Sequence, residues 1–250
     1  MTSVLKANEL LYLSMLCGAN EIFGIPDIFH GKSDEEITVL VKKTSKACFT
    51  KGLIRSDFEG IRRLDNSVEK AISLVSAPSA FTELIIRKSK ARHQRYLIYS
   101  KGKDRTVIFE SGGEYFITEN RELLAIHTAM FVLFANGCLL DAEKRPLTIS
   151  CSELSKMKTV KKQKSTIMRT LMKENGADEI TASLIAEGMT GRAGYFSATK
   201  LDILDKDIKT AFFLADSGVI LRIESDSNHG ICFSAIDSET ALQTALSFWE

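Results

Sequence analysis

The sequence lacks the features that mark several common classes of protein. Its five cysteines form no CxxC pair, and such isolated thiols are typical of a reducing compartment. They are Cys17, Cys48, Cys138, Cys151 and Cys232. The apolar run over residues 10–17 is too short to span a bilayer as a helix. The stretch over residues 125–140 contains a histidine, an asparagine and a glycine, which favours a buried helix over a membrane span. We therefore expect a cytoplasmic protein with no membrane insertion.

Catalytic and cofactor signatures are also missing. None of the four histidines (His30, His93, His127, His229) has the HxxH or HExxH spacing of a metal site. The run Gly188-Met-Thr-Gly-Arg-Ala-Gly194 differs from the nucleotide-binding patterns and precedes a strand instead of opening a helix, so its amides would not converge on a phosphate. We expect no cofactor, no metal, no catalytic residues and no enzymatic activity.

A strong net charge is absent as well. The chain has 33 Lys and Arg against 32 Asp and Glu, which gives a formal net charge of +1. A polyanionic partner would therefore have to be bound by a local basic patch. Two basic runs are candidates, residues 87–95 and residues 156–164, although a lysine-rich stretch is more often a solvated surface than a binding site.

What the sequence does contain is an order of elements that occurs twice. Four β-rich runs begin near Ala80, His93, Arg105 and Glu114, and four more begin near Ala193, Ile208, Val219 and Gly230, about 115 residues later. Helical segments precede each set and one helix follows it. With 44% apolar and 26% charged residues, the composition is that of an ordinary globular protein.

Helix signals are clear in both halves. After a short extended start at Val4 and Leu5, Asn8 is placed to cap a helix. Capping boxes at residues 33–36 and 150–153 predict two further helix starts. The first of these boxes opens a helix that ends before Gly52 and carries a predicted inward stripe, which consists of Ile37, Leu40, Val41 and Cys48. Another helix is predicted over residues 66–76.

The β-rich runs are joined by short turns, such as Lys101-Gly-Lys-Asp104 and Ser111-Gly-Gly-Glu114, so neighbouring strands must be antiparallel. We predict an internally duplicated α+β fold with two four-stranded meanders flanked by helices. Its halves are residues 1–136 and 137–250, and the alternative is one continuous domain. Edge pairing would join the two meanders in one sheet, because exposed edges favour further pairing.

The first basic run supplies the candidate binding residues, which are Arg87, Lys88, Lys90, Arg92 and Arg95. Tyr96 and Tyr99 lie beside it, and aromatic rings next to basic residues suit single-stranded nucleic acid. Strand alternation, however, places the two rings on opposite faces. Nucleic-acid binding through residues 87–95 is therefore the alternative function, and the run is equally suited to a protein partner.

The order of features resembles one known family. A short strand and a capped helix are followed by Lys51-Gly-Leu-Ile54, by Phe58-Glu-Gly-Ile-Arg-Arg-Leu-Asp65, by a helix, and by Ser76-Ala-Pro-Ser79 before a strand that ends at Arg87. Gly176, the strand over 194–200 and the segment 212–235 before a last helix continue the pattern. This order resembles the EspG family of type VII (ESX) secretion chaperones, as a distant member from a Gram-positive system.

The resemblance implies a quasi-two-fold α+β fold with a central antiparallel sheet and flanking helical bundles. It also implies a non-enzymatic cytosolic chaperone that binds the helical tip of a secretion substrate, a helical hairpin, and keeps it soluble. Family members use the sheet, the second-half bundle and the loop after the first meander strand, which here is residues 87–95. Nucleic acid is then the less favoured partner, and whether the free chain forms a homodimer through a sheet edge is left open.

Overall fold

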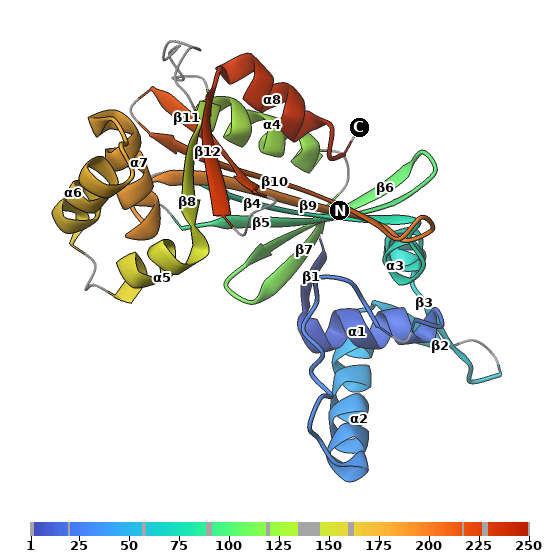
Figure 1. The fold of residues 1–250 in the computed structure, drawn as a ribbon. Helices are drawn as coiled ribbons and strands as arrows, with labels where there is room; N and C mark the ends of the chain where they lie inside the picture. The colour runs from blue at the N-terminus through green and yellow to red at the C-terminus, as the bar shows by residue number, and fades with distance from the viewer. Residues whose placement is uncertain are drawn as a thin grey trace. The chain divides into compact units, whose positions relative to one another are not determined.

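The fold was obtained as a computed structural model (Figure 1). It describes residues 3–19, 21–56, 59–88, 92–118, 121–134, 146–159, 163–216, 218–226 and 230–249. Within these ranges, ten strands form one antiparallel sheet in the order β1-β7-β6-β5-β4-β9-β10-β11-β12-β8, and β2 and β3 form a separate hairpin. The α+β class predicted from the sequence is confirmed. Among the described residues, no helix is long and apolar enough to cross a membrane.

The first half of the chain contains seven strands and four helices in its described part. The strands are β1 (Ser3–Lys6), β2 (Ile54–Ser56), β3 (Arg62–Leu64), β4 (Ala80–Arg87), β5 (Gln94–Lys101), β6 (Asp104–Ser111) and β7 (Glu114–Thr118). The helices are α1 (Ala7–Leu16), α2 (Asp34–Thr50), α3 (Asn66–Ser76) and α4 (Arg121–Phe134). The predicted bounds of the helix over 66–76 and of the strand over 80–87 are confirmed.

The second half has a similar order. The strands are β8 (Leu147–Ser150), β9 (Gly194–Asp202), β10 (Asp207–Asp216), β11 (Val219–Ser225) and β12 (Gly230–Ile236). The helices are α5 (Cys151–Thr159), α6 (Lys164–Glu174), α7 (Glu179–Met189) and α8 (Ser238–Leu246). A strand that precedes the helices pairs with the last meander strand in each half, β1 with β7 and β8 with β12. An internal duplication stays a prediction, and the proposed boundary at residues 136 and 137 lies outside the described residues.

By its contacts the chain divides into two compact units. Unit 1 comprises residues 1–83, 95–124 and 200–208, and unit 2 comprises residues 84–94, 125–199 and 209–250. The units therefore do not coincide with stretches of continuous sequence. Each unit is built around its own apolar cluster.

In unit 1, helix α1 begins at Ala7 after the N-cap residue Lys6, so the prediction that Asn8 caps this helix is wrong. The helix is buried along most of its length, and α2 and α3 pack against it. Tyr12 on α1 donates a hydrogen bond to Ser45 on α2 over 3.0 Å, and Asn8 donates to Thr44 over 2.7 Å. The predicted capping box at the start of α2 is present, because Ser33 and Glu36 exchange side-chain to backbone hydrogen bonds. The C-terminal half of α2 is thus fixed to α1 by hydroxyl and amide groups.

A three-way contact of Arg95 connects the loop after α1 with the meander of unit 1. Its Nε donates to Glu83 over 2.6 Å, its Nη1 donates to Glu110, and its Nη2 donates to the carbonyl oxygen of Gly24 over 2.8 Å. The buried Tyr99 supports the same loop, because its hydroxyl donates to the carbonyl oxygen of Phe23 over 2.6 Å. Arg95 therefore holds three segments that are distant in sequence.

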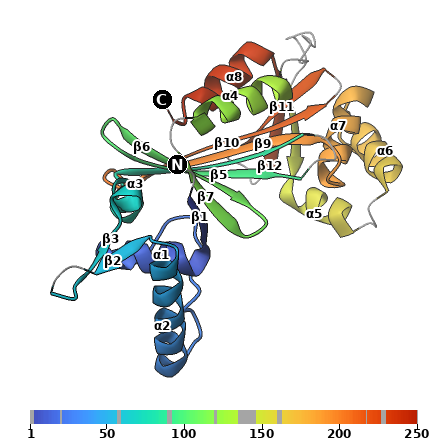
Figure 2. The same ribbon diagram turned by 180° about the vertical axis from the view of Figure 1, so that it is seen from behind.

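In unit 2, the sheet carries helices on both faces. Phe134 of α4, Phe196 of β9 and Phe213 of β10 form an aromatic cluster with ring centroids 5.7–5.9 Å apart. Helix α8 lies beside α4 on this face (Figures 1 and 2), and Trp249 donates to Nε2 of His127 on α4 over 3.3 Å. The opposite face contributes Leu221 and Phe233 to a second cluster with α5, α6 and α7.

Replacing Arg95 by methionine is expected to destabilise the protein, because Glu83 and Glu110 would keep their charge without a partner. The carboxylates are 29% and 23% exposed, so solvent screens part of this cost, and we expect a loss of about 2 kcal/mol in the free energy of unfolding. Urea denaturation measures it. Arg92→Met is the matched control, because Arg92 is exposed, and equal stability of the two variants would contradict the structural role of Arg95.

Candidate partner-binding site

Arg87, the last residue of β4, is held against the beginning of β9 in unit 2. Its Nη2 donates to the carbonyl oxygen of Ala193 over 2.9 Å, and its guanidinium carbon lies 4.6 Å from the centre of the Tyr195 ring. Both side chains are half-buried. This cation–π contact and the hydrogen bond fix the guanidinium in one place.

The turn after α7 explains why Ala193 is available to Arg87. Gly191 has a φ of +74°, which lets the chain reverse after the helix, and the amides of Arg192 and Ala193 donate to the carbonyl oxygen of Glu187. Gly194 follows, and a Cβ atom there would lie 2.8 Å from the carbonyl oxygen of Ala215. The glycine run of residues 188–194 is thus explained by backbone geometry and close packing.

Glu187 contributes a second anchor beside this turn. Its carboxylate forms an ion pair with Lys164 at the start of α6. A side-chain hydrogen bond with Asp216 and then the Lys164 ammonium hold the pKa of Glu187 below its usual range. Because the charged form is favoured, the link between α6 and α7 is retained near neutral pH.

An apolar row runs across four strands on the face of the sheet that carries α5, α6 and α7. The strand register places Phe212 opposite Ile223, Ile223 opposite Phe233, and Phe233 opposite Leu147. Directly opposed residues of an antiparallel pair share a face, so the four side chains form one line. We call these residues the apolar row.

The apolar row is only partly covered. Phe233 is buried, Ile223 and Leu147 are half-buried, and Phe212 is 45% exposed. Tyr195 lies on the same face as Phe212. Their neighbours Phe196 and Phe213 both point to the aromatic cluster on the other face, and successive residues of a strand alternate between the two faces. A partly open apolar surface beside a fixed cation suits an amphipathic helix that carries an acidic group.

The five predicted binding residues have different environments. Arg87 contacts Ala193 and Tyr195 of unit 2, as described above, whereas Arg95 makes its three contacts within unit 1. Lys88 and Arg92 are exposed and form no ion pair with any described residue. Lys90 lies outside the described residues. The loop therefore offers Lys88 and Arg92 as available cations, and its two terminal arginines have internal contacts.

Sequence reasoning did not identify Tyr195, Phe212 or the rest of the apolar row. One signal was available, since the segment Ala211-Phe-Phe-Leu-Ala215 is apolar at consecutive positions. This pattern predicts a strand with apolar side chains on both faces. The strand partners that complete the row come from β8, β11 and β12, and no local pattern connects them.

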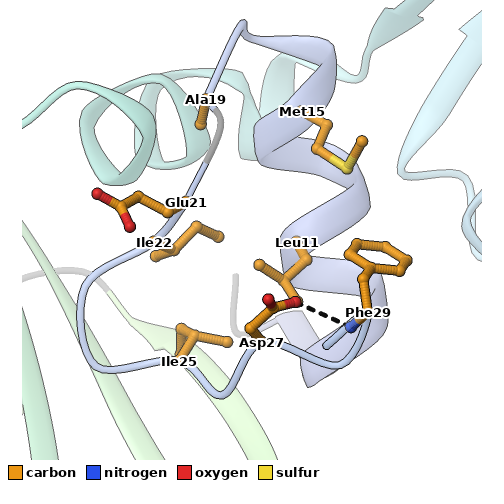
Figure 3. Close-up of a pocket in the computed structure, with 8 residues that line it drawn as sticks. All are labelled: Leu11, Met15, Ala19, Glu21, Ile22, Ile25, Asp27 and Phe29. Carbon is orange, nitrogen blue, oxygen red and sulfur yellow. Dashed lines mark hydrogen bonds between the residues drawn. The ribbon is translucent and has the colours of Figure 1, made fainter. Parts of the chain in front are cut away.

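A cavity of about 300 Å³ lies elsewhere, between α1 and the loop that follows it in unit 1 (Figure 3). It is lined by Leu11, Met15, Ala19, Glu21, Ile22, Ile25, Asp27 and Phe29. Asp27 is engaged by its own loop, because its carboxylate accepts a hydrogen bond from the amide of Phe29 over 2.8 Å. Across the described ranges, no group of three or more His, Cys, Asp or Glu residues is arranged to hold a metal ion.

Comparisons with known proteins find a match in structure and none in sequence. No model of a protein family matches the chain, and no curated protein does. Among solved structures, the fold is similar to that of the Mycobacterium tuberculosis type VII secretion system chaperone EspG5, solved in complex with the PE25–PPE41 dimer. The TM-score is 0.61 at 10% sequence identity, over 99% of this chain and 96% of that one. The protein has an EspG-like fold, and the predicted fold is thereby confirmed.

Substitutions of Arg87 and of its neighbour Lys88 test whether the contacts of Arg87 with Ala193 and Tyr195 stabilise the fold. Arg87→Met removes the hydrogen bond to Ala193 and the contact with the Tyr195 ring, and we expect a loss of about 2 kcal/mol in the free energy of unfolding. Arg87→Lys keeps the charge without the planar group, so it is expected to recover only part of that loss.

The control is Lys88→Met, which changes an exposed side chain and is expected to shift the free energy of unfolding by less than about 0.5 kcal/mol. Urea denaturation of the three variants gives the comparison. If Arg87→Met were as stable as Lys88→Met, the contacts of Arg87 with Ala193 and Tyr195 would not stabilise the fold as described above.

Proposed function

We propose that the protein is a cytoplasmic chaperone that binds a helical substrate of a type VII secretion system and keeps it soluble for export. The observation that carries this proposal is the apolar row, which is left partly open at Phe212 in a fold similar to that of a secretion chaperone. EspG5 was solved with a PE–PPE dimer bound. For this chain we propose a helical hairpin as the substrate and a non-enzymatic role.

The physical basis is that an export substrate with an apolar helical tip aggregates unless a complementary surface covers the tip. The apolar row and Tyr195 would receive the apolar residues of such a tip. Lys88 and Arg92 would attract acidic residues of the same partner, and they would act more on the association rate than on the affinity.

The burial of the aromatic residues beside residues 87–95 argues against the alternative, which is nucleic-acid binding through that segment. Tyr96 is 2% exposed and Tyr99 is 0% exposed, so neither ring is accessible for stacking on a base. Of the basic side chains, Arg87 and Arg95 are already engaged by groups of the protein. We therefore favour a protein partner.

A pull-down of the full chain from its native cytosol, washed at high salt, tests the proposed function. Recovery of a helical-hairpin export protein, identified by mass spectrometry, is the expected result, because an apolar interface is retained at high salt. Nucleic-acid binding depends steeply on salt through counterion release. Recovery of nucleic acid alone at low salt, with no protein retained at high salt, would refute the chaperone function.

Phe212→Asp is expected to weaken binding of the recovered substrate by roughly 30-fold or more, because a central aromatic contact of an interface is worth about 2 kcal/mol. Leu204→Asp is the matched control, since Leu204 is 78% exposed in the turn between β9 and β10 and lies outside the apolar row. Isothermal titration calorimetry measures both. Equal affinities of the two variants would place the substrate on another surface.

Lys88→Glu combined with Arg92→Glu is expected to slow association several-fold at low salt and to leave the dissociation rate nearly unchanged. The reason is that exposed charges act at long range and are screened by salt. Surface plasmon resonance at two salt concentrations separates the rates. Lys101→Glu combined with Lys103→Glu is the control of equal charge change, and an identical effect of both pairs would show only a dependence on net charge.

A further inference from the structure

Helix α2 presents a face to solvent that the chaperone function does not use. Its inner side is fixed to α1 through Thr44 and Ser45, and Cys48 is fully buried. Its N-terminal half is less covered, and both views show this helix running away from α1 (Figures 1 and 2). The predicted inward residues of that half, Ile37, Leu40 and Val41, are only half-buried.

The outward side of α2 combines apolar and basic residues in one line. Val39, Lys42, Lys46 and Phe49 are spaced by three, four and three residues, which places them on one side of a helix, and Lys43 lies beside them. Val39 is 67% exposed and Phe49 is 55% exposed. The three lysines are exposed as well. We call these five residues, together with Arg62 of β3, the basic helix face.

The cations of the basic helix face have no acidic partner among the described residues. Lys42, Lys43 and Lys46 form no ion pair there, and Arg62 donates to two neutral hydroxyls, those of Tyr12 and Ser45.

Other cations close by in the chain are neutralised. Lys51 pairs with Glu9 over 2.7 Å, and Arg55 pairs with Asp65. The acidic residues of α2 are in its first turn. The C-terminal part of the helix therefore presents three lysines that form no ion pair with a described residue, and Arg62 of β3, which donates to Ser45, adds a fourth positive charge.

We propose that the basic helix face binds an anionic membrane surface. Polybasic segments that bind acidic lipids carry about four to eight basic side chains, and each contributes about fivefold to binding. Val39 and Phe49 are separated by about 15 Å along the helix axis, so a helix that lies flat on the membrane places both at the same depth. The lysine stems then lie along the apolar layer while their ammonium groups reach the phosphates.

A lipid surface fits this face better than a nucleic acid does. Nucleic-acid binding gains from aromatic rings that stack on successive bases, and Val39 has no ring. The apolar side chains at the two ends of the lysine cluster can instead enter the headgroup region while the ammonium groups bind the phosphates. The contact does not require the chaperone function, because α2 belongs to unit 1 and the apolar row to unit 2.

Co-sedimentation of the full chain with vesicles tests the proposal. We expect binding to phosphatidylcholine vesicles that contain phosphatidylserine at about one third of the lipid, and little binding to pure phosphatidylcholine. Replacing Lys42, Lys43 and Lys46 by glutamine is expected to lower the partition coefficient on the order of 100-fold. Val39→Ser with Phe49→Ser is expected to lower it roughly tenfold at unchanged net charge.

The control replaces Lys101, Lys103 and Lys209 by glutamine, which are exposed lysines outside α2, so that the net charge changes equally. Circular dichroism of each variant verifies that the helix content of the protein is unchanged. Equal binding to both vesicle types, or equal losses in the α2 triple variant and its control, would overturn the proposal. Binding to a DNA duplex that competes with the vesicles through the same lysines, with no effect of Val39→Ser and Phe49→Ser, would assign the face to nucleic acid instead.

Discussion

Unequal coverage of the sheet in unit 2 is the constraint on which the proposed function depends. Strand β10 is apolar on both sides, since Phe213 points into the aromatic cluster with Phe134 and Phe196, while Phe212 points the other way. Helices α4 and α8 close the first side. On the second side α5, α6 and α7 bury Phe233 and leave Phe212 open, so the sheet retains apolar surface for a partner.

The arginines near residue 90 show how basic residues contribute to architecture. Arg87 fixes the beginning of β9 through Ala193 and Tyr195, and Arg95 fixes the loop at Gly24 to the carboxylates of Glu83 and Glu110. Both arginines gain their partners only in the folded chain. The charges that are left for association, Lys88 and Arg92, lie between them in sequence.

Local signals predicted most of the secondary structure, because helix caps and hairpin turns involve residues close together in sequence. The capping box of Ser33 and the turn at residues 111–114 are examples, and the second box is confirmed by hydrogen bonds between Ser150 and Glu153. The sheet positions of β1 and β8 were not predicted, since strands of four residues carry little pattern and their partners are distant.

The candidate site was predicted much less completely. A run of basic residues indicates charge, but the internal contacts of Arg95 depend on residues 12, 15 and 71 positions away in the chain. The apolar row depends on strand register across β10, β11, β12 and β8. The stripe on α2 was predicted as inward, and its first half is only partly buried because α1 packs against the C-terminal half of this helix.

The most direct test of the central claim is hydrogen–deuterium exchange of the protein, alone and in complex with the substrate recovered from its cytosol. The account predicts new protection of backbone amides in residues 209–216 and 219–225, around Phe212 and Ile223, with little change in α4 and α8. Protection confined to α4 and α8, with β10 and β11 unchanged, would contradict it, because the substrate would then lie on the face that the protein already covers with its own helices.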